Sequence, residues 1–136
     1  MKLAVGIDLV QVSRIAESRA HFGARFLERI YTPTEIAYAA AAPDQTNERL
    51  AARFAAKEAA LKALGLADQG VSWREIEVVR TSSGACELAL HGRARELAPG
   101  ATNIALSLSH EGDLATAVVV ANQPEGPPPP QHRSIP

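Results

Sequence analysis

The sequence predicts a single domain of the α+β class. Its 136 residues are the usual size of one folded domain and are enough to bury a core. Segments with strand-like and with helical spacing of apolar residues are both present, but they do not form repeated βαβ units. A short glycine-containing loop at residues 111–113 joins the last two apolar segments, which is typical of an antiparallel hairpin.

The first third of the chain predicts one strand followed by helices. The apolar run Leu3–Val10 predicts the strand. Over Val12–Ile30 the apolar residues recur at helical spacing, which predicts one helix or two helices separated at Gly23. The segment Thr32–Glu35 is typical of a helix start, because proline is tolerated in the first turn and a threonine hydroxyl accepts a backbone N–H there. This helix must end before Pro43.

The longest predicted helix comes next. It begins at Thr46 or Asn47 as its N-cap and ends at Gly65 as its C-cap. A short helix over 92–97 is also expected. Four later apolar segments predict strands: Trp73–Arg80, Cys86–His91, Thr102–Ser109 and Thr116–Ala121.

Proline content divides the chain into a folded domain, residues 1–122, and a proline-rich tail, residues 123–136. Six of the nine prolines lie in the last 13 residues, and such a segment continues neither a helix nor a sheet. The tail either binds an aromatic groove of a partner or is an unstructured end without a role. The second interpretation is favoured, because chain ends are often loose.

Charge and cysteine content exclude several classes of protein. The net charge is −1, from 14 basic and 15 acidic residues, which argues against a nucleic-acid-binding protein and against an acidic disordered chain. One cysteine, Cys86, forms no internal disulfide. The apolar runs are too short for a bilayer span or a signal peptide, so we expect a cytoplasmic protein that binds no membrane.

The helix over residues 50–65 carries the most informative charged residues. At about 100° per residue, Glu58 and Lys62 lie one turn apart at the edge of an apolar stripe, and Lys57 projects into that stripe. The simplest interpretation is a surface Glu58–Lys62 ion pair, with Lys57 extending its ammonium group to solvent. The apolar stripe is formed by Leu50, Phe54, Leu61 and Leu64.

A second interpretation is a magnesium site. Asp8 interrupts an apolar strand, and a carboxylate there needs a partner. Asp8 and Glu58 together suit Mg²⁺, which takes few protein oxygens and keeps water and phosphate oxygens as its other ligands. Lys62 and Arg53 then supply positive charge to those phosphates.

His110 ends a strand segment, Ser107–His110, with its side chain available at the start of a turn. A surface turn histidine is the simplest interpretation. A serine-hydrolase pair of Ser109 and His110 is disfavoured, because adjacent strand residues point in opposite directions. Cys86 lacks any local signature of a catalytic nucleophile.

Five blocks of the sequence, in order, resemble holo-acyl-carrier-protein synthase, the short single-module branch of the 4′-phosphopantetheinyl transferases. They cover residues 5–120, nearly everything except the tail. The third and fifth blocks are the most specific. The blocks are Gly6–Val10, Arg25–Thr32 with Glu35, Arg53–Ala59, Ser72–Val78 and Ser107–His110.

The resemblance implies transfer of 4′-phosphopantetheine from coenzyme A to a serine of apo acyl carrier protein, with release of adenosine 3′,5′-bisphosphate. The product serves fatty acid or polyketide synthesis. The implied fold is a small mixed domain in which one long central helix lies against an antiparallel sheet. The implied assembly is a homotrimer with active sites shared between subunits.

The resemblance also implies the site residues. Asp8 and Glu58 are the metal ligands and, with Lys62, the catalytic residues; Glu58 acting through a water is the first choice of general base and Asp8 the second. The implied coenzyme A contacts are Arg53, Lys62, Gly65 and His110. The implied carrier-protein docking residues lie in a basic stretch and are Arg14, Phe22, Arg25, Phe26 and Arg29.

Two departures from the family pattern concern the coenzyme A contacts. Many relatives carry Gly-Lys-Pro or Gly-Arg-Pro where this chain has Gly84–Cys86, so a cation and a proline are missing. The basic residue expected for the coenzyme 3′-phosphate is also not evident. Asp44, Gln45 and Asn47 occupy that region, and only Arg49 is close.

Two other functions compete with the transferase. One is a carrier-protein-binding module that kept the fold and lost turnover. The other is a different Mg²⁺-dependent enzyme that acts on a nucleotide phosphate without a protein acceptor. The joint presence of Asp8, Glu58, Lys62 and His110 favours the transferase over both.

Overall fold

The computed structural model describes residues 2–98 and 103–123. Two antiparallel sheets and five α-helices make up this part of the chain, which confirms the predicted α+β class. None of the helices described is long and apolar enough to cross a membrane. The elements are β1 (Lys2–Gln11), α1 (Val12–Phe22), α2 (Ala24–Ile30), α3 (Pro33–Ala40), η1 (Pro43–Gln45), α4 (Thr46–Leu64), η2 (Trp73–Glu75), β2 (Ile76–Arg80), β3 (Cys86–Leu90), α5 (Gly92–Leu97), β4 (Asn103–Glu111) and β5 (Leu114–Gln123).

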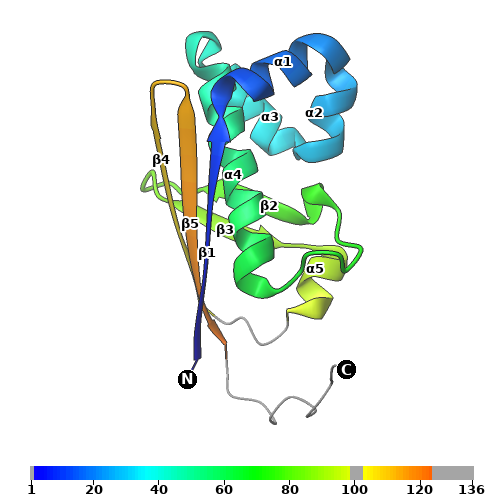
Figure 1. The fold of residues 1–136 in the computed structure, drawn as a ribbon, viewed down its shortest axis with the longest axis vertical. Coiled ribbons are helices and arrows are strands. Elements are labelled where there is room, and N and C mark those ends of the chain that lie inside the picture. Colours follow the sequence, from blue (N-terminus) through cyan, green and yellow to red (C-terminus); the bar gives the residue numbers. More distant parts are fainter. Residues whose placement is uncertain (1, 99–102, 124–136) are drawn as a thin grey trace, which may run out of the picture.

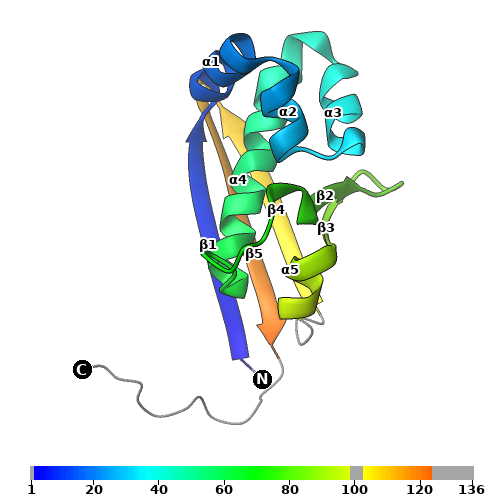
Figure 2. The same cartoon turned by 90° about the vertical axis from the view of Figure 1, so that its right-hand side faces the viewer.

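The larger sheet has the strand order β1-β5-β4, and α4 lies along one of its faces (Figures 1 and 2). The helices α1, α2 and α3 gather around the first half of α4. The small β2–β3 sheet and α5 lie near its second half. The long central helix contacts all three strands of the larger sheet, as the resemblance implies, and also α1, α3, η1 and β2.

Local sequence signals fix several element ends. Gly23 adopts a φ of 58° between α1 and α2, so the stretch forms two helices. At α3 the Thr32 hydroxyl accepts the Glu35 N–H at 3.2 Å, and the Glu35 carboxylate accepts the Thr32 N–H at 2.9 Å. This reciprocal pair is a capping box. Gly65 closes α4 in the left-handed conformation, with a φ of 65°.

Three local predictions need correction. Thr46 does not cap α4, because η1 precedes it directly and Thr46 is already helical; its hydroxyl donates to the Ala39 and Ala42 carbonyls. The segment 73–75 forms the 3₁₀ turn η2 rather than the start of a strand. Gln123, the first residue of the predicted tail, is instead the last residue of β5 and pairs with Lys2. Residues 124–136 of that tail, and Thr102 of the predicted 102–109 strand, lie outside the described residues.

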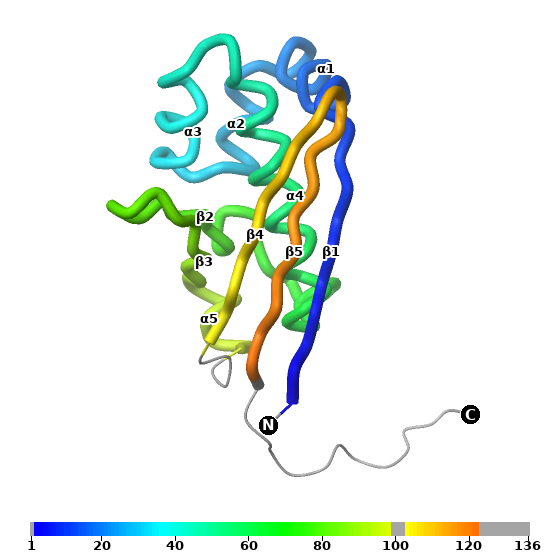
Figure 3. Tube along the Cα trace, turned by 90° about the vertical axis from the view of Figure 1, so that its left-hand side faces the viewer, coloured from blue at the N-terminus to red at the C-terminus, as the bar shows by residue number. Residues whose placement is uncertain are grey.

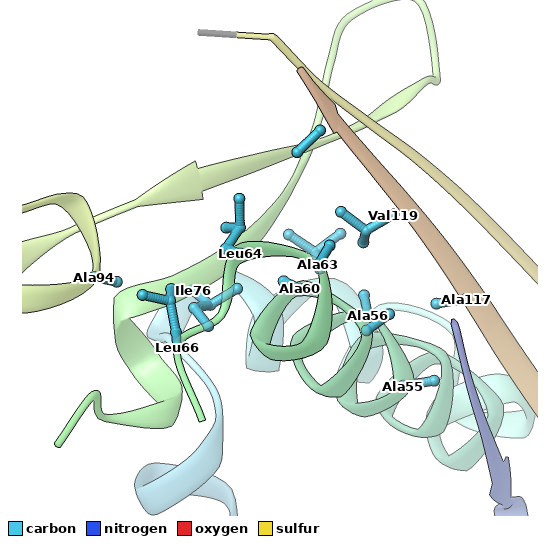
Figure 4. Packing of buried hydrophobic residues seen from close by; sticks show 13 residues of the cluster. Ala55, Ala56, Ala60, Ala63, Leu64, Leu66, Ile76, Ala94, Ala117 and Val119 are labelled. Atoms are coloured by element: carbon cyan, nitrogen blue, oxygen red, sulfur yellow. The ribbon is translucent and has the colours of Figure 1, made fainter. Parts of the chain in front are cut away.

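Small residues allow α4 to lie very close to the sheet. Alanines line the buried side of the helix, and Ala117 and Val119 of β5 face them (Figure 4). A Cβ added at Gly6 of β1 would lie only 2.0 Å from the Ala59 carbonyl oxygen, so only glycine fits there. This close approach brings β1 and α4 near enough to share a site.

The other face of the large sheet is not covered by any described element (Figure 3). In β1, residues that point toward α4 alternate with large apolar residues that point away from it. Leu3, Val5, Ile7 and Leu9 are between 62% and 66% exposed. An apolar surface of this kind is typical of an interaction face.

Candidate functional site

Asp8, Glu58 and Lys62 come together on the β1 side of α4. Asp8 lies on the same face of β1 as Gly6, so it points toward the helix. The Lys62 ammonium donates to the Ile7 carbonyl at 2.9 Å and to the Asp8 carboxylate at 3.2 Å. The predicted Glu58–Lys62 surface pair is therefore wrong, because the strand brings a nearer partner to Lys62.

The two carboxylates of this cluster influence each other. Partial burial raises the pKa of Glu58, the negative charge of Asp8 raises it further, and the positive charge of Lys62 lowers it in part. A like charge nearby disfavours the ionised form of a carboxylate, and an added positive charge restores it. The cluster thus carries two acidic groups and one basic group, with Lys62 offsetting part of their negative charge.

These donors fit Mg²⁺. Among the residues described there is no group of three or more His, Cys, Asp or Glu side chains that would hold a metal ion. Mg²⁺ does not need such a group, because one or two carboxylates suffice when waters and substrate phosphates complete its coordination. Asp8 and Glu58 are the residues that would hold it.

Gly65 lies one turn beyond Lys62, at the end of α4. The position of its missing Cβ has no atom within 4 Å, so this end of the helix is open. At about 100° per residue, Gly65 lies about 60° from Lys62 around the helix axis, and its contact with coenzyme A stays a prediction.

A cavity of about 560 Å³ lies on the opposite flank of α4. Its lining includes Arg53 and His110, two predicted coenzyme contacts, and Cys86 from the loop that departs from the family pattern. Arg53 is 4% exposed, and its buried Nε has no hydrogen-bond partner in the described structure. Burial lowers the pKa of Arg53, which nearby Cys86 and Tyr38 oppose. A buried donor without a partner costs stability.

The helix and the sheet keep the two groups of residues apart within one chain. At about 100° per residue, Arg53 is about 140° from Glu58 around α4 and about 180° from Lys62. Asp8 lies on β1 and His110 on β4, with β5 between them. The predicted site residues therefore form two clusters, which we call the carboxylate cluster (Asp8, Glu58, Lys62 and Gly65) and the arginine cavity (lined by Arg53 and His110).

The sequence model of the 4′-phosphopantetheinyl transferase superfamily matches residues 4–119. The chain belongs to this superfamily. It is 47% identical over 123 residues to the holo-[acyl-carrier-protein] synthase of Koribacter versatilis, with 88% of this chain and 98% of that protein aligned. It is 48% identical over 117 residues to the synthase of Carboxydothermus hydrogenoformans, with 85% and 94% aligned.

Solved structures agree with this assignment. The Chronobacterium ammoniagenes ACPS–CoA complex superposes with a TM-score of 0.79 at 34% identity, over 92% of this chain and 100% of that one. The Helicobacter pylori holo-[acyl-carrier-protein] synthase in complex with coenzyme A has a TM-score of 0.77 at 29% identity, over 87% and 99%. The phosphopantetheinyl transferase fold predicted from the resemblance is confirmed.

A second hollow of this transferase, of about 420 Å³, lies beside α1 and α2. Four of the five predicted docking residues line it, and Phe22 among them is 57% exposed. Arg14 is exposed on α1 but does not line the hollow. Its floor includes Phe54 and Trp73, whose ring centroids are 5.0 Å apart and which the sequence did not indicate. The lining docking residues are Phe22, Arg25, Phe26 and Arg29.

Lys57 of the transferase does not extend to solvent, contrary to the simple interpretation of its sequence. Its side chain has 0% exposure and its ammonium group pairs with Glu35 at 2.8 Å. It also donates to the Trp73 and Ile76 carbonyls at 3.2 and 2.6 Å. A lysine inside an apolar helix stripe was the available signal, because such a group needs buried partners.

Proposed function

We propose that this chain is a holo-acyl-carrier-protein synthase that transfers 4′-phosphopantetheine from coenzyme A to a serine of apo acyl carrier protein. The observation that carries the proposal is the carboxylate cluster, which lies in a chain whose curated relatives bear that name. The attacking hydroxyl belongs to the carrier protein, so the chain needs no nucleophile of its own. Since coenzyme A is an intracellular metabolite, we place the reaction in the cytoplasm.

The roles of the cluster follow from its chemistry. Asp8 and Glu58 would hold Mg²⁺, which supplies Lewis-acid stabilisation of the pyrophosphate charge when bound. The serine oxygen bonds to the phosphorus that carries the pantetheine arm, and the bridging oxygen leaves with adenosine 3′,5′-bisphosphate. Glu58 accepts the serine proton through a water, a task that its raised pKa favours; Asp8 is the alternative base. Lys62 has one ammonium hydrogen left for a phosphate oxygen.

Intact-mass measurement tests the transfer directly. The chain is incubated with coenzyme A, MgCl₂ and apo acyl carrier protein, and the carrier is expected to gain the mass of one phosphopantetheine group. Glu58→Gln is expected to abolish the gain, whereas the exposed Glu96→Gln control retains it. Binding of the carrier without a mass gain would instead support a binding module that has lost turnover.

We further propose that the complete site forms between subunits of a homotrimer. Since the carboxylate cluster and the arginine cavity lie on opposite flanks of α4, one coenzyme A would need the cluster of one subunit and the cavity of another. The exposed apolar face of β1 offers the surface for such an assembly.

Subunit mixing tests the shared site. Glu58→Gln and His110→Ala are each expected to be inactive, and co-refolded mixtures are expected to regain activity, because some interfaces then combine two intact halves. Ile7→Asp, which places a charge on the apolar face, is expected to give an inactive monomer by ultracentrifugation. Mixtures without any regained activity would contradict a site shared between subunits.

We also propose that the hollow beside α1 and α2 docks the acidic carrier protein. Its two arginines, with Arg14 nearby on the same helix pair, complement an acidic partner, and Phe22 offers an apolar contact. Combined Arg14→Glu and Arg25→Glu substitutions are expected to raise the KM for the carrier and weaken its salt dependence. An unchanged KM would place the docking surface elsewhere.

A further inference from the structure

The one cysteine of the chain, Cys86, lines the arginine cavity. It is the first residue of β3, and its side chain is only partly buried. It belongs to the segment Gly84–Cys86, where this chain departs from the family pattern. The cavity of about 560 Å³ is large enough for a small ligand. A small solute that enters the cavity therefore meets a thiol that is particular to this chain.

Two arginines from other elements lie beside this thiol. In the β2–β3 register Arg80 is directly opposite Cys86, and residues directly opposite each other project from the same face of a sheet. Arg53 reaches the same cavity from α4. Burial lowers the pKa of Arg53, and the nearby Cys86 opposes this lowering. The thiol thus has basic neighbours from β2 and from the long helix.

A tyrosine holds these basic side chains together. The guanidinium carbons of Arg49, Arg53 and Arg80 lie 4.0, 4.2 and 5.3 Å from the centroid of the Tyr38 ring. Arg80 also donates to the Tyr38 hydroxyl at 2.6 Å. Within residues 2–98 and 103–123, none of the three arginines forms an ion pair, although Glu48 also lines the cavity. The cavity therefore surrounds the thiol with positive charge that has no close counter-charge in the described structure.

The buried arginine is a separate observation that points to a ligand. Arg53 is 4% exposed, and its Nε has no hydrogen-bond partner among the residues described. An acceptor brought into the cavity relieves the cost of such a donor. Guanidinium groups favour a carboxylate or a phosphate as that acceptor. An anionic ligand in this cavity lies next to Cys86.

Thiol–disulfide exchange is the chemistry that these surroundings favour. Reactive cysteines are partly exposed and have basic neighbours, and positive charge attracts an anionic reagent. The thiolate attacks one sulfur of a disulfide R–S–S–R. A Cys86–S–S–R bond forms, the reagent's S–S bond breaks, and the other half leaves as the thiolate RS⁻. The electrons balance without a further oxidant, because the disulfide is itself reduced.

We propose that Cys86 is a site of reversible modification by small disulfides that carry carboxylate or phosphate groups, and that the adduct closes the arginine cavity. The modification itself needs no transferase activity. Its consequence, exclusion of the coenzyme, rests on the proposed function, because the adduct occupies space beside the predicted contacts Arg53 and His110. The sequence did not indicate this site, because the basic neighbours of the thiol come from other elements.

A matched set of disulfides measures the role of charge. The reagents are anionic 3,3′-dithiodipropionate, neutral bis(2-hydroxyethyl) disulfide and cationic cystamine, and intact mass follows the adduct over time. Each rate for the folded protein is divided by the rate of the same reagent with the chain unfolded in urea, because the leaving thiols differ in pKa. This normalised rate is expected to be about tenfold higher for the anionic than for the cationic reagent. Equal normalised rates would overturn the inference.

Variants show whether the arginines cause the preference. Arg80→Gln is expected to lose most of it, whereas the matched control Arg95→Gln, at an exposed arginine of α5, is expected to keep it. A preference that is unchanged in Arg80→Gln would overturn the inference. Glutathione disulfide and coenzyme A disulfide distinguish a carboxylate source of the anion from a phosphate source. Both are expected to exceed the neutral reagent in normalised rate, and the faster one identifies the source.

Calorimetry tests closure of the cavity. Adenosine 3′,5′-bisphosphate is the ligand, because the thiol of coenzyme A would itself reduce the adduct. The dithiodipropionate adduct is expected to bind it at least about tenfold more weakly than the free protein, and dithiothreitol to restore binding. Cys86→Ser, treated in the same way, is expected to keep its own starting affinity. Equal binding by adduct and free protein would overturn closure. If the charge preference is found but the free protein modifies no carrier, the modification site stands and the proposed function fails.

Discussion

Two lysines, five residues apart on α4, form ion pairs of opposite character. Lys57 and Glu35 meet at 2.8 Å and both side chains have 0% exposure. Lys62 and Asp8 meet at 3.2 Å with 53% and 19% exposure. One helix thus carries a pair sealed in the interior and a pair open to solvent.

The lysine of the sealed pair has no hydrogen-bond donor left. Lys57 uses its three donors on Glu35 and on two backbone carbonyls. Glu35 in turn accepts the backbone N–H groups of Thr32 and Val78. The open pair keeps one lysine donor, and Glu58 stands beside it with a raised pKa. An unused hydrogen-bond donor next to solvent, rather than the residue type, distinguishes the candidate site from the buried pair.

The largest expected effect is the loss of stability on breaking the sealed pair. Lys57→Met is expected to lower the free energy of unfolding by about 3–5 kcal/mol, because it leaves the Glu35 charge buried without a partner. Lys62→Met, at the exposed pair, is expected to change it by less than about 1 kcal/mol. Denaturant titrations measure both changes in unfolding free energy. All titrations use one protein concentration, because association of subunits contributes to the apparent stability.

A double variant separates loss of the pair from loss of volume. Lys57→Met combined with Glu35→Gln is expected to recover part of the stability, because no buried charge then remains unpaired. Similar losses for Lys57→Met and Lys62→Met would remove the distinction between the two pairs.

Features that depend on neighbouring residues could be predicted from the sequence. The Thr32 cap of α3 and the Gly65 C-cap of α4 depend on residues within one turn, and both were confirmed. The partner of Lys57 lies 22 residues away, and Arg80 is 42 residues from Tyr38, so only packing brings them together. Periodicity placed Lys57 inside the apolar stripe but did not show which carboxylate would meet it.

The carboxylate cluster was predicted differently, since the family resemblance indicated Asp8 and Glu58 as joint metal ligands. Elementary chemistry had also suggested that Asp8 and Glu58 together suit Mg²⁺, but it did not show that β1 and α4 would bring them together. Lys62 proved to be a partner of Asp8, at 3.2 Å. The separation of this cluster from the arginine cavity follows from the sheet order β1-β5-β4, which no local pattern specifies.

The next expected effect is on activity, and it contrasts two glutamates. Glu58→Gln is expected to reduce transfer more than about a hundredfold, because it removes a proposed metal ligand, and to leave the unfolding free energy nearly unchanged. Glu35→Gln is expected to destabilise the fold by about 2 kcal/mol or more while the folded fraction still transfers. Transfer rates normalised to the folded fraction distinguish these outcomes. A destabilised Glu58→Gln would place Glu58 in the scaffold.

A smaller effect concerns pH. Burial and Asp8 raise the pKa of Glu58, so its contribution to stability is present below the unfolded pKa and is lost as pH rises through the folded pKa. The transfer rate has the opposite pH dependence. It is expected to fall as the pH drops through the Glu58 pKa of the folded protein, because metal binding needs the ionised carboxylate. Lys62→Met is expected to raise the Glu58 pKa further, and Asp8→Asn to lower it. Carboxyl ¹³C titration of the metal-free protein measures both shifts, and shifts in the reverse directions would contradict the cluster.

The smallest expected effect is the salt response of the two pairs. Double-mutant cycles isolate the coupling energy of each pair. The Lys62–Asp8 coupling is expected to be about 0.5 kcal/mol at low salt and to shrink at 1 M NaCl, where the screening length is about 3 Å. The Lys57–Glu35 coupling is expected to stay constant, because ions do not enter a site with 0% exposure. A salt-sensitive Lys57–Glu35 coupling would mean that solvent reaches the pair through local opening of α3, and α3 would then be a mobile wall of the arginine cavity rather than a fixed one.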